Sequence, residues 1–255
     1  MSQYVLIELF NNFVMKRFFD IVFSLIGLII FLPIIILISI FVWFEDKSNP
    51  LYISKRVGLN GNYFKMIKIR TMVVNADKFC IDSTSSKDPR ITKIGKYLRN
   101  YKLDELPQLF NILFGELSFV GPRPNVRREI DLYSNLELNL LTVKPGITDF
   151  ASIVYSDESQ ILADKKDPDL SYNQLIRPGK SMLGLFYIEN KNLFVDIFLI
   201  ITTIISLFSR KTSLTLVSYL LKKLKASNKI LKIASRKTPL VPSPAPGYNE
   251  FLKKR

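Results

Sequence analysis

An apolar run of 24 residues, from Ile21 to Phe44, is the strongest pattern in the chain, and no charged residue lies within it between Asp20 and Glu45. A helix rises about 1.5 Å per residue, so this run reaches about 36 Å and is long enough to cross a bilayer. A signal peptide has a shorter apolar region, of about 7 to 15 residues, and a small-residue cleavage site, and neither feature is present. A buried helix of a soluble domain is the other alternative, but apolar runs beyond about 18 residues are rare there. We predict a membrane helix within residues 1–45.

Pro33 lies close to the middle of the apolar run, where it removes a helical hydrogen bond and imposes a bend. Such a helix can either span the bilayer or turn back within it. Lys16 and Arg17 precede the run, and a basic region follows it. With positive charge on both flanks, the preference of lysine and arginine for the cytoplasmic side gives no clear orientation. The pattern alone leaves both topologies open.

A β-hairpin is predicted for Leu51 to Arg70. Strand-type residues lie on both sides of Asn60-Gly61, a dipeptide suited to the positive backbone angles of a hairpin turn. Lys68 and Arg70 are two residues apart, so on a strand they point to the same face. They form either a small cationic surface or an ordinary solvated face.

Two helices are predicted further along, with a pair of carboxylates between them. The first has an apolar stripe at helical spacing, made of Ile91, Ile94, Leu98 and Tyr101. Its basic side is made of Arg90, Lys93, Lys96 and Arg99. The second apolar set consists of Leu106, Leu109, Phe110 and Leu113. Pro107 fits this second helix only in the first turn, so Asp104 and Glu105 are expected at a helix N-terminus.

The C-terminal part holds one more apolar run and a basic segment. Leu193 to Phe208 has 16 residues and contains Asp196, so it is expected to pack against the core or the membrane surface rather than to span. Leu214 to Lys237 places leucine and isoleucine among clustered lysines, as interfacial amphipathic helices do. Pro239 to Gly247 is rich in proline and is expected to be unfolded.

The net charge of +14 is concentrated in this C-terminal part. Residues 211–255 have 11 Lys and Arg against Glu250 alone, which gives +10, while residues 1–210 have 25 bases against 21 acids, which gives +4. Such a tail favours attachment to an anionic lipid bilayer. Nucleic-acid binding is not expected, because the tail lacks aromatic residues interleaved with its lysines and adjoins a membrane protein.

Composition also limits the chemistry. The chain has no histidine, which excludes histidine bases, Ser-His-Asp triads and most catalytic zinc sites. Cys80 is the single cysteine, so an internal disulfide and a cysteine metal cluster are excluded, and Cys80 is expected to be an ordinary thiol. Proton chemistry must therefore use carboxylates, lysine or tyrosine.

The surroundings of Asp104 and Glu105 suit a phosphate. Adjacent acids at a helix start are common by themselves, because the helix dipole favours them. Here Arg99 lies five residues before Asp104, and Gly121-Pro122-Arg123-Pro124 follows the second helix. An arginine between two prolines has little freedom, so it is presented at low entropic cost to a bidentate anion such as pyrophosphate. A rigid loop with a surface arginine is the alternative, and a divalent metal would reconcile the carboxylates with a phosphate.

Six short strings in a fixed order make the sequence recognisable. They are Lys16-Arg17-Phe18-Phe19-Asp20, Arg56-Val57-Gly58, Lys68-Ile69-Arg70-Thr71-Met72, Asp88-Pro89-Arg90-Ile91-Thr92, Leu103-Asp104-Glu105-Leu106-Pro107-Gln108 and Ser118-Phe119-Val120-Gly121-Pro122-Arg123-Pro124. In this order and spacing they resemble the bacterial sugar transferases, the monotopic phosphoglycosyl transferases that initiate surface glycan assembly. The resemblance covers about residues 15–210.

The resemblance implies that Asp104 is the nucleophile, which attacks the sugar-bearing phosphate of a UDP-sugar, releases UMP and forms an aspartyl-phosphosugar. Polyprenyl (undecaprenyl) phosphate then resolves this intermediate. Mg²⁺, with Asp104 as a ligand, would neutralise the diphosphate. Glu105 would assist as a proton acceptor or by orienting its neighbours. The substrate-binding residues that the resemblance implies are Lys68, Arg99, Arg123 and Asp196.

The expected fold is α/β, or α+β, with three parts. Residues 1–45 form a membrane helix, which the resemblance indicates is re-entrant, and residues 46–210 form a small cytoplasmic catalytic domain with a β-hairpin and amphipathic helices. Residues 211–255 form the basic tail, and the enzyme would act at the cytoplasmic face of the inner membrane. The alternative is a non-catalytic membrane-tethered module whose basic helices hold anionic lipid.

Two positions depart from the pattern of many family members. Leu32 stands where serine often precedes the proline of the membrane helix, and Asp149 stands where glycine is common. The stretch after Asp149 as far as Lys180 is longer than in the smallest members, and the choice of sugar is expected to be made there. The sequence names neither the sugar nor the oligomeric state.

Overall fold

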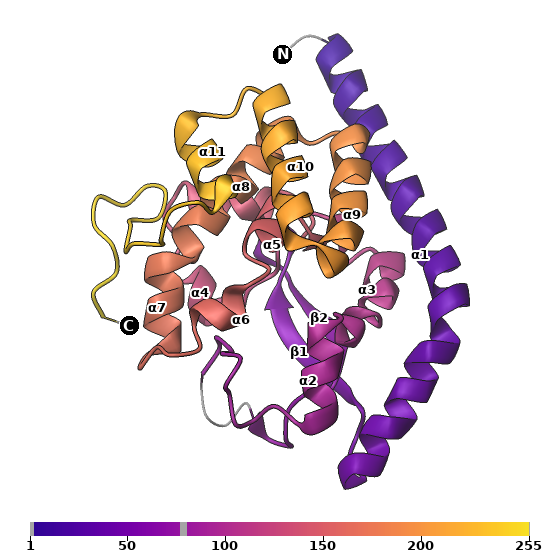
Figure 1. The fold of residues 1–255 in the computed structure, drawn as a ribbon. Coiled ribbons are helices and arrows are strands. Elements are labelled where there is room, and N and C mark those ends of the chain that lie inside the picture. Colours follow the sequence, from indigo (N-terminus) through magenta and orange to yellow (C-terminus); the bar gives the residue numbers. More distant parts are fainter. Residues whose placement is uncertain (1–2, 77–80, 255) are drawn as a thin grey trace.

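A long N-terminal helix, two small sheets and a set of shorter helices make up the fold (Figure 1). The structure is a computed structural model that describes residues 3–76 and 81–254, so the thiol expected at Cys80 lies outside the described residues. The helices are α1 (Gln3–Asp46), α2 (Lys93–Asn100), α3 (Gln108–Phe114), α4 (Arg127–Ile130), α5 (Phe150–Val154), α6 (Glu158–Ile161), α7 (Pro168–Leu175), α8 (Arg177–Asn190), α9 (Leu193–Phe208), α10 (Arg210–Lys223) and α11 (Asn228–Ser235). The strands are β1 (Leu51–Val57), β2 (Tyr63–Ile69), β3 (Ser118–Val120) and β4 (Gly146–Thr148). Mixed helix and strand content confirms the expected class.

The predicted hairpin is confirmed as β1 and β2. The two strands pair antiparallel, from Leu51 opposite Ile69 to Val57 opposite Tyr63. Residues 58–62 connect them, and Asn60 and Gly61 both have positive φ, at 54° and 80°. The local chemistry of the dipeptide therefore set the turn, as the sequence indicated.

A parallel pair of short strands, β3 and β4, brings the loop after β3 against the start of β4. Val120 pairs with Thr148, and the backbones approach very closely at the next residues. A Cβ atom on Gly121 would lie 2.4 Å from the Lys144 carbonyl oxygen, and one on Gly146 would lie 2.1 Å from the Gly121 nitrogen. Both positions require glycine. This close contact fixes the position of the backbone just before Arg123.

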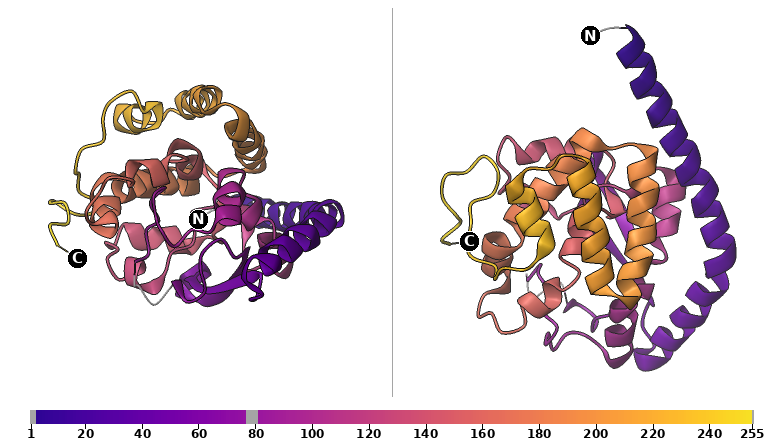
Figure 2. Two further views of the ribbon diagram at one scale, coloured as in Figure 1. Left: turned by 60° about the horizontal axis from the view of Figure 1, so that its bottom comes forward. Right: turned by 45° about the horizontal axis from the view of Figure 1, so that its top comes forward.

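The membrane helix is unbroken. α1 continues through Pro33 to Asp46 and is long and apolar enough, from Val14 onward, to cross a membrane by length and composition. It curves along one side of the other elements, beside α9 and α3, and its N-terminal end projects beyond them (Figures 1 and 2). The helix is thus curved as a whole and has no break at Pro33. A break would leave several carbonyls unpaired, and Leu32 has no hydroxyl with which to satisfy them.

The basic C-terminal segment is not a separate tail in the structure. α10 and α11 pack on α5, α8 and α9, and the fully buried Val217, Leu220 and Leu221 belong to the largest hydrophobic core. The Pro-rich segment has neither helix nor strand, but it is tied to the domain because Ser243 N–H donates to the Gln174 carbonyl at 3.1 Å. Its expected unfolded state is therefore not what the structure has.

Candidate active site

Asp104 and Glu105 lie in η3 (Leu103–Glu105), a single 3-10 turn between α2 and α3. They are therefore just before α3 rather than inside its first turn. Lys102, which precedes the turn, has a left-handed backbone with φ of 55°. Pro107 is the N-cap of α3, where its missing N–H costs no hydrogen bond. The expected helix start is a 3-10 turn that leads into α3.

Glu105 is the centre of the ion pairs at this site. Its Oε1 accepts from Lys68 Nζ at 3.0 Å and from Arg123 Nη2, and its Oε2 accepts from Arg123 Nη1 at 3.2 Å. Lys68 comes from β2 and Arg123 from the loop after β3, so Glu105 joins three parts of the chain. Burial alone would raise the pKa of the Glu105 carboxyl, but Arg123 and Lys68 hold that pKa well below its usual range. Glu105 is a fixed anion.

Asp104 has a different environment. The residue is 7% exposed, and its Oδ2 lies 3.8 Å from Lys68 Nζ, which is an ion pair but too long for a hydrogen bond. Among the described residues its carboxylate accepts no hydrogen bond. Burial raises the pKa of Asp104, Lys68 opposes this rise, and the charge of Glu105 adds to it. Adjacent carboxylates with pKa values moved in opposite directions are typical of sites with divided chemical roles.

Arg99, at the end of α2, faces the same carboxylates. Its Nε donates to Thr71 Oγ1 at 2.8 Å. Burial lowers the pKa of the Arg99 guanidinium, and the nearby charge of Asp104 opposes this shift. The structure therefore brings together Lys68, Arg99, Arg123 and both carboxylates, as the sequence predicted.

Lys102 is a cation of the site that the sequence analysis did not single out. Burial lowers the pKa of its ammonium group, and the charge of Glu105 opposes this shift. Its position directly before Leu103 and Asp104 was the available signal, but its proximity to Lys68 and Arg123 depends on folding that brings together parts distant in sequence. With Lys68, Arg99 and Arg123 it makes four cations around two carboxylates. The surplus of positive charge suits a diphosphate.

Asp196 is not brought to this site. It is buried in α9 at 2% exposed, binds Lys16 Nζ and accepts a hydrogen bond from the Tyr187 hydroxyl at 2.7 Å. Lys16 also donates to the Val120 carbonyl at 3.0 Å. These contacts fasten α1 to α9 and β3, so Asp196 lies in an anchoring cluster, apart from the carboxylate pair.

Other residues of the string at 16–20 anchor α1 in the same way. Arg17 donates to two carbonyls at the end of α3, at 2.7 Å each, where positive charge is favourable. Asp20 is 2% exposed and accepts from Ser118 Oγ and the Phe119 N–H, both at 3.1 Å. The string thus binds the membrane helix to the elements around the carboxylate pair.

The residues present fit a Mg²⁺ ion that is shared with a substrate. Among the described residues, no group of three His, Cys, Asp or Glu side chains gathers into a metal cage. Mg²⁺ often uses one or two carboxylates together with substrate phosphates and waters, so a cage is not required. Glu105 is occupied by Lys68 and Arg123, whereas the Asp104 oxygens accept no hydrogen bond from any residue that the structure describes. Asp104 is the fitting ligand.

An apolar groove of about 570 Å³ lies beside the turn. It is formed by the second half of α1, the start of β1, one residue of β2 and the start of α3. Its lining residues are Leu32, Ile35, Ile36, Ser39, Ile40, Trp43, Pro50, Leu51, Ile67, Pro107 and Phe110. Pro107, two residues after Glu105 in the chain, belongs to the wall of this groove.

An anchored membrane helix and a carboxylate pair among four cations are the parts that a membrane-bound, phosphate-handling enzyme requires. A sequence model described as bacterial sugar transferase matches residues 11–210, which is most of the chain. The chain belongs to the bacterial sugar transferase family and is a membrane-anchored enzyme.

Curated relatives agree with this assignment. The exopolysaccharide production protein ExoY of Rhizobium meliloti (strain 1021) is 34% identical over 204 residues, which are 74% of this chain and 83% of that protein. The UDP-glucose:undecaprenyl-phosphate glucose-1-phosphate transferase of Klebsiella pneumoniae is 34% identical over 206 residues, 79% of this chain and 42% of that protein. The UDP-N-acetylgalactosamine-undecaprenyl-phosphate N-acetylgalactosaminephosphotransferase of Aeromonas hydrophila is 29% identical over 196 residues, 74% of this chain and 42% of that protein. The last two names differ in the sugar, so likeness alone does not choose one.

Proposed function

We propose that the enzyme transfers a phosphosugar from a UDP-sugar to polyprenyl phosphate through a covalent intermediate on Asp104. The contrast between the two carboxylates carries this proposal. Glu105 is held by Lys68 and Arg123, whereas Asp104 is buried with no hydrogen bond among the described residues. A carboxylate with free oxygens can attack phosphorus. The names of the Klebsiella and Aeromonas relatives include undecaprenyl phosphate and a UDP-sugar, which supports these substrates.

The transfer takes place in two in-line steps. In the first, an Asp104 oxygen attacks the phosphorus that carries the sugar, the bond from this phosphorus to the bridging oxygen breaks, and UMP leaves. In the second, a phosphate oxygen of polyprenyl phosphate attacks the same phosphorus and displaces Asp104, whose carboxylate is restored. Each step exchanges one P–O bond for another.

The cations bind and orient the donor. Lys68, Arg99 and Arg123 are suited to hold its phosphate oxygens, and Glu105 fixes two of these cations, Lys68 and Arg123, at the start of the reaction. A Mg²⁺ ion bound by Asp104 and the diphosphate would supply further positive charge to the phosphates. Glu105 is therefore a positioning residue in this proposal.

The apolar groove supports a lipid acceptor. Its walls come from α1 and from Pro107 and Phe110, next to the carboxylate pair. An isoprenoid chain in this groove would keep its tail against the membrane helix and its phosphate at Asp104. Burial of the chain is favourable at about 25 cal/mol for each Å² of apolar surface.

A screen of UDP-sugars with purified enzyme, Mg²⁺ and polyprenyl phosphate tests the function, with UMP release as the readout. We expect repeated turnover with at least one donor. We also expect no more than one UMP per enzyme when the acceptor is omitted, because the intermediate is then not resolved. Absence of UMP release with every donor would contradict the proposal.

Lys68→Met is expected to move the acid limb of the pH profile of kcat/KM to higher pH. Asp104 must be ionised to attack, so activity falls as the pH drops through its pKa. Burial raises that pKa and Lys68 is the strongest opposing charge, so its removal raises the pKa further. At pH 7 we expect kcat/KM to fall at least about tenfold. The matched control is Lys65→Met, at an exposed position of the same strand, which should keep the wild-type profile; a profile unchanged by Lys68→Met would contradict the assignment.

We further propose that α1 enters one leaflet without crossing it, so that the N-terminus and the catalytic domain are both cytoplasmic. Both ends of the apolar run are bonded to the same domain, which supports this topology. At one end are Lys16 and Asp20, and at the other Asp46 receives two hydrogen bonds of 2.6 Å from Arg70. A helix that crossed the bilayer would carry one of these ends away from its partners. Within this run, the apolar residue Ile29 has an exposed fraction of 77%.

The topology predicts that a cysteine at position 3, in a Cys80→Ser background, is protected in intact cells. A membrane-impermeant thiol reagent should label it only after the inner membrane is permeabilised. Efficient labelling of intact cells would show that the N-terminus is outside and that α1 spans the membrane.

A further inference from the structure

A second, smaller cavity has the loop that contains Arg123 as one of its walls. It has a volume of about 50 Å³ and lies between this loop, the starts of α5 and α8, and α7. Arg123 belongs both to its wall and to the ion pair with Glu105. The cavity is therefore adjacent to the position proposed for the phosphates of the donor.

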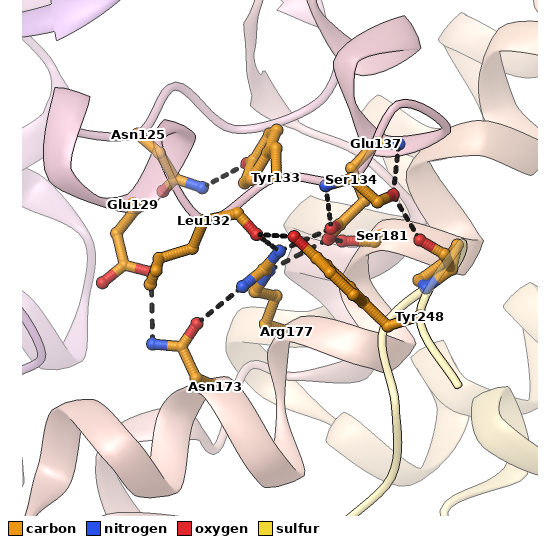
Figure 3. Close-up of polar contacts among 11 residues, drawn as sticks. Asn125, Glu129, Leu132, Tyr133, Ser134, Glu137, Asn173, Arg177, Ser181 and Tyr248 are labelled. Atoms are coloured by element: carbon orange, nitrogen blue, oxygen red, sulfur yellow. Dashed lines mark hydrogen bonds and ion pairs between the residues drawn. The ribbon is translucent and has the colours of Figure 1, made fainter. Parts of the chain in front are cut away.

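Its cationic lining residues are already neutralised. Arg177 Nε and Nη2 donate to the two carboxylate oxygens of Glu137 at 2.9 Å and 2.5 Å, and Arg177 Nη1 donates to Asn173 Oδ1 at 3.0 Å (Figure 3). The remaining lysine, Lys180, is paired with Glu158. Ser181 donates to Glu137 at 2.6 Å in the same network (Figure 3). With these charges paired, the cavity suits a neutral polar group and does not suit a phosphate or a carboxylate.

Tyr172 and Asp149 are lining residues with hydrogen-bonding capacity to spare. Tyr172 is 8% exposed, and its hydroxyl has no hydrogen-bond partner among the described residues. Asp149 is 2% exposed, caps α5 by accepting the Ser152 N–H at 2.6 Å, and has hydrogen bonds to Ser152 alone. A ligand that accepts from the Tyr172 hydroxyl and donates to the Asp149 carboxylate would use this capacity, with the gain that hydrogen bonds of low-exposure groups give.

The volume of the cavity and its apolar lining limit which chemical group it can hold. A cavity of about 50 Å³ holds about three or four water molecules. That is the size of a substituent of four heavy atoms, not of a whole sugar ring. Ile130, Leu140 and Val143 add apolar surface to the lining. A group with an N–H donor, a carbonyl acceptor and a methyl would match the three kinds of lining, which are the acceptor Asp149, the donor Tyr172 and the apolar side chains.

We propose that this cavity binds the 2-acetamido substituent of the donor sugar, with Asp149 accepting from its N–H and Tyr172 donating to its carbonyl. C2 is one bond from C1, which carries the phosphate, so a phosphate held at Arg123 brings this substituent to the shared wall. Asp149 and Tyr172 are then specificity-determining residues, and the enzyme prefers N-acetylhexosamines over plain hexoses. This inference rests on the proposed transfer from a UDP-sugar.

The preference is measured as a ratio of kcat/KM values for UMP release, UDP-GalNAc over UDP-Gal and UDP-GlcNAc over UDP-Glc. For the wild type we expect a ratio of about ten or more in at least one pair. Tyr172→Phe, which removes only the hydroxyl, should lower this ratio about fivefold. Asp149→Asn keeps the cap of α5 but turns an amide donor toward the cavity, and should lower the ratio about tenfold. The control is Tyr219→Phe, at an exposed position of α10, which should keep the ratio.

The outcomes separate this inference from the function on which it rests. Turnover with a wild-type ratio near one in both pairs, or a high ratio that both variants retain, would overturn the inference and leave the function standing. Absence of turnover with every donor would overturn both. Thermal melting of Tyr172→Phe and Asp149→Asn, compared with wild type, identifies a variant that has lost its fold, and the other variant then decides.

Discussion

Asp104→Asn should reduce turnover by several orders of magnitude while the protein remains folded. The change keeps the shape of the side chain but removes the oxygen that forms the bond to phosphorus and the carboxylate that fits Mg²⁺. Asp104 differs from a structural carboxylate because it has no hydrogen bond among the described residues, so the change removes only its long ion pair with Lys68, at 3.8 Å. The measurement is the initial rate of UMP release with the best donor.

Stability should respond in the opposite direction to activity. Burial raises the pKa of Asp104 in the folded protein, so the folded state binds this proton more tightly than the unfolded state. Stability from this group is therefore present at low pH and declines as the pH rises through the folded pKa. Asn carries no charge to bury, and Asp104→Asn should melt at the same or a higher temperature at pH 8. The control is Asp131→Asn, an exposed partner of Arg127, which should keep normal turnover; normal turnover in Asp104→Asn would refute its role.

Truncation after Ser209 should abolish the folded protein, although all of the removed part except Arg210 lies outside residues 11–210, which the family model matches. Val217, Leu220 and Leu221 are each at most 1% exposed in the main core. Full burial of such a side chain contributes about 1.5–3 kcal/mol, so three of them contribute about 5–9 kcal/mol. The net stability of a typical domain is about 5–15 kcal/mol. Size-exclusion chromatography in detergent and circular dichroism should therefore show an aggregated or unfolded chain.

The matched control is a truncation after Leu252, which removes three basic residues and keeps the hydrogen bond from Gln174 to the Leu252 carbonyl. This shorter deletion should leave folding and activity as in the wild type. A folded, active enzyme after removal of residues 210–255 would contradict the structural role of α10 and α11 and would support an independent, membrane-binding tail.

Local sequence signals predicted the elements whose conformation is set locally. Asn60-Gly61 supplies positive φ angles at the tip of the hairpin, and the apolar spacing of residues 91–101 gave α2. The apolar run from Leu193 to Phe208 is α9 to the residue. The same reasoning did not predict how α10 and α11 pack, because their lysines give the same amphipathic pattern whether the apolar face meets lipid or a protein core. That choice depends on the surface that α5, α8 and α9 offer.

For the candidate site, too, the sequence predicted some placements correctly and missed others. Asp104, Glu105, Lys68, Arg99 and Arg123 were predicted from short strings and come together in the structure. Asp196 was predicted with them, but it lies in the cluster that holds α1, since a string gives no information on which cluster a buried acid joins.

The roles of the remaining residues follow from burial and long-range contacts. Lys102 and Tyr172 have no sequence pattern that marks them. Their roles are inferred because the Lys102 ammonium lies near the charge of Glu105, and because the hydroxyl of Tyr172, a residue that is 8% exposed, has no hydrogen-bond partner among the described residues. Pro33 does not break α1, because the helix loses one hydrogen bond at proline, whereas a break at membrane depth would lose several. The structure therefore has one continuous helix through Pro33.

Whether Asp104 forms the covalent intermediate is tested by mass spectrometry of the enzyme after brief incubation with a UDP-sugar and Mg²⁺, without acceptor. We expect a mass increase of one phosphosugar, located on the peptide that contains Asp104, absent in Asp104→Asn and lost when polyprenyl phosphate is added. An enzyme that turns over the same donor with no adduct, or with an adduct on another residue, would contradict the account.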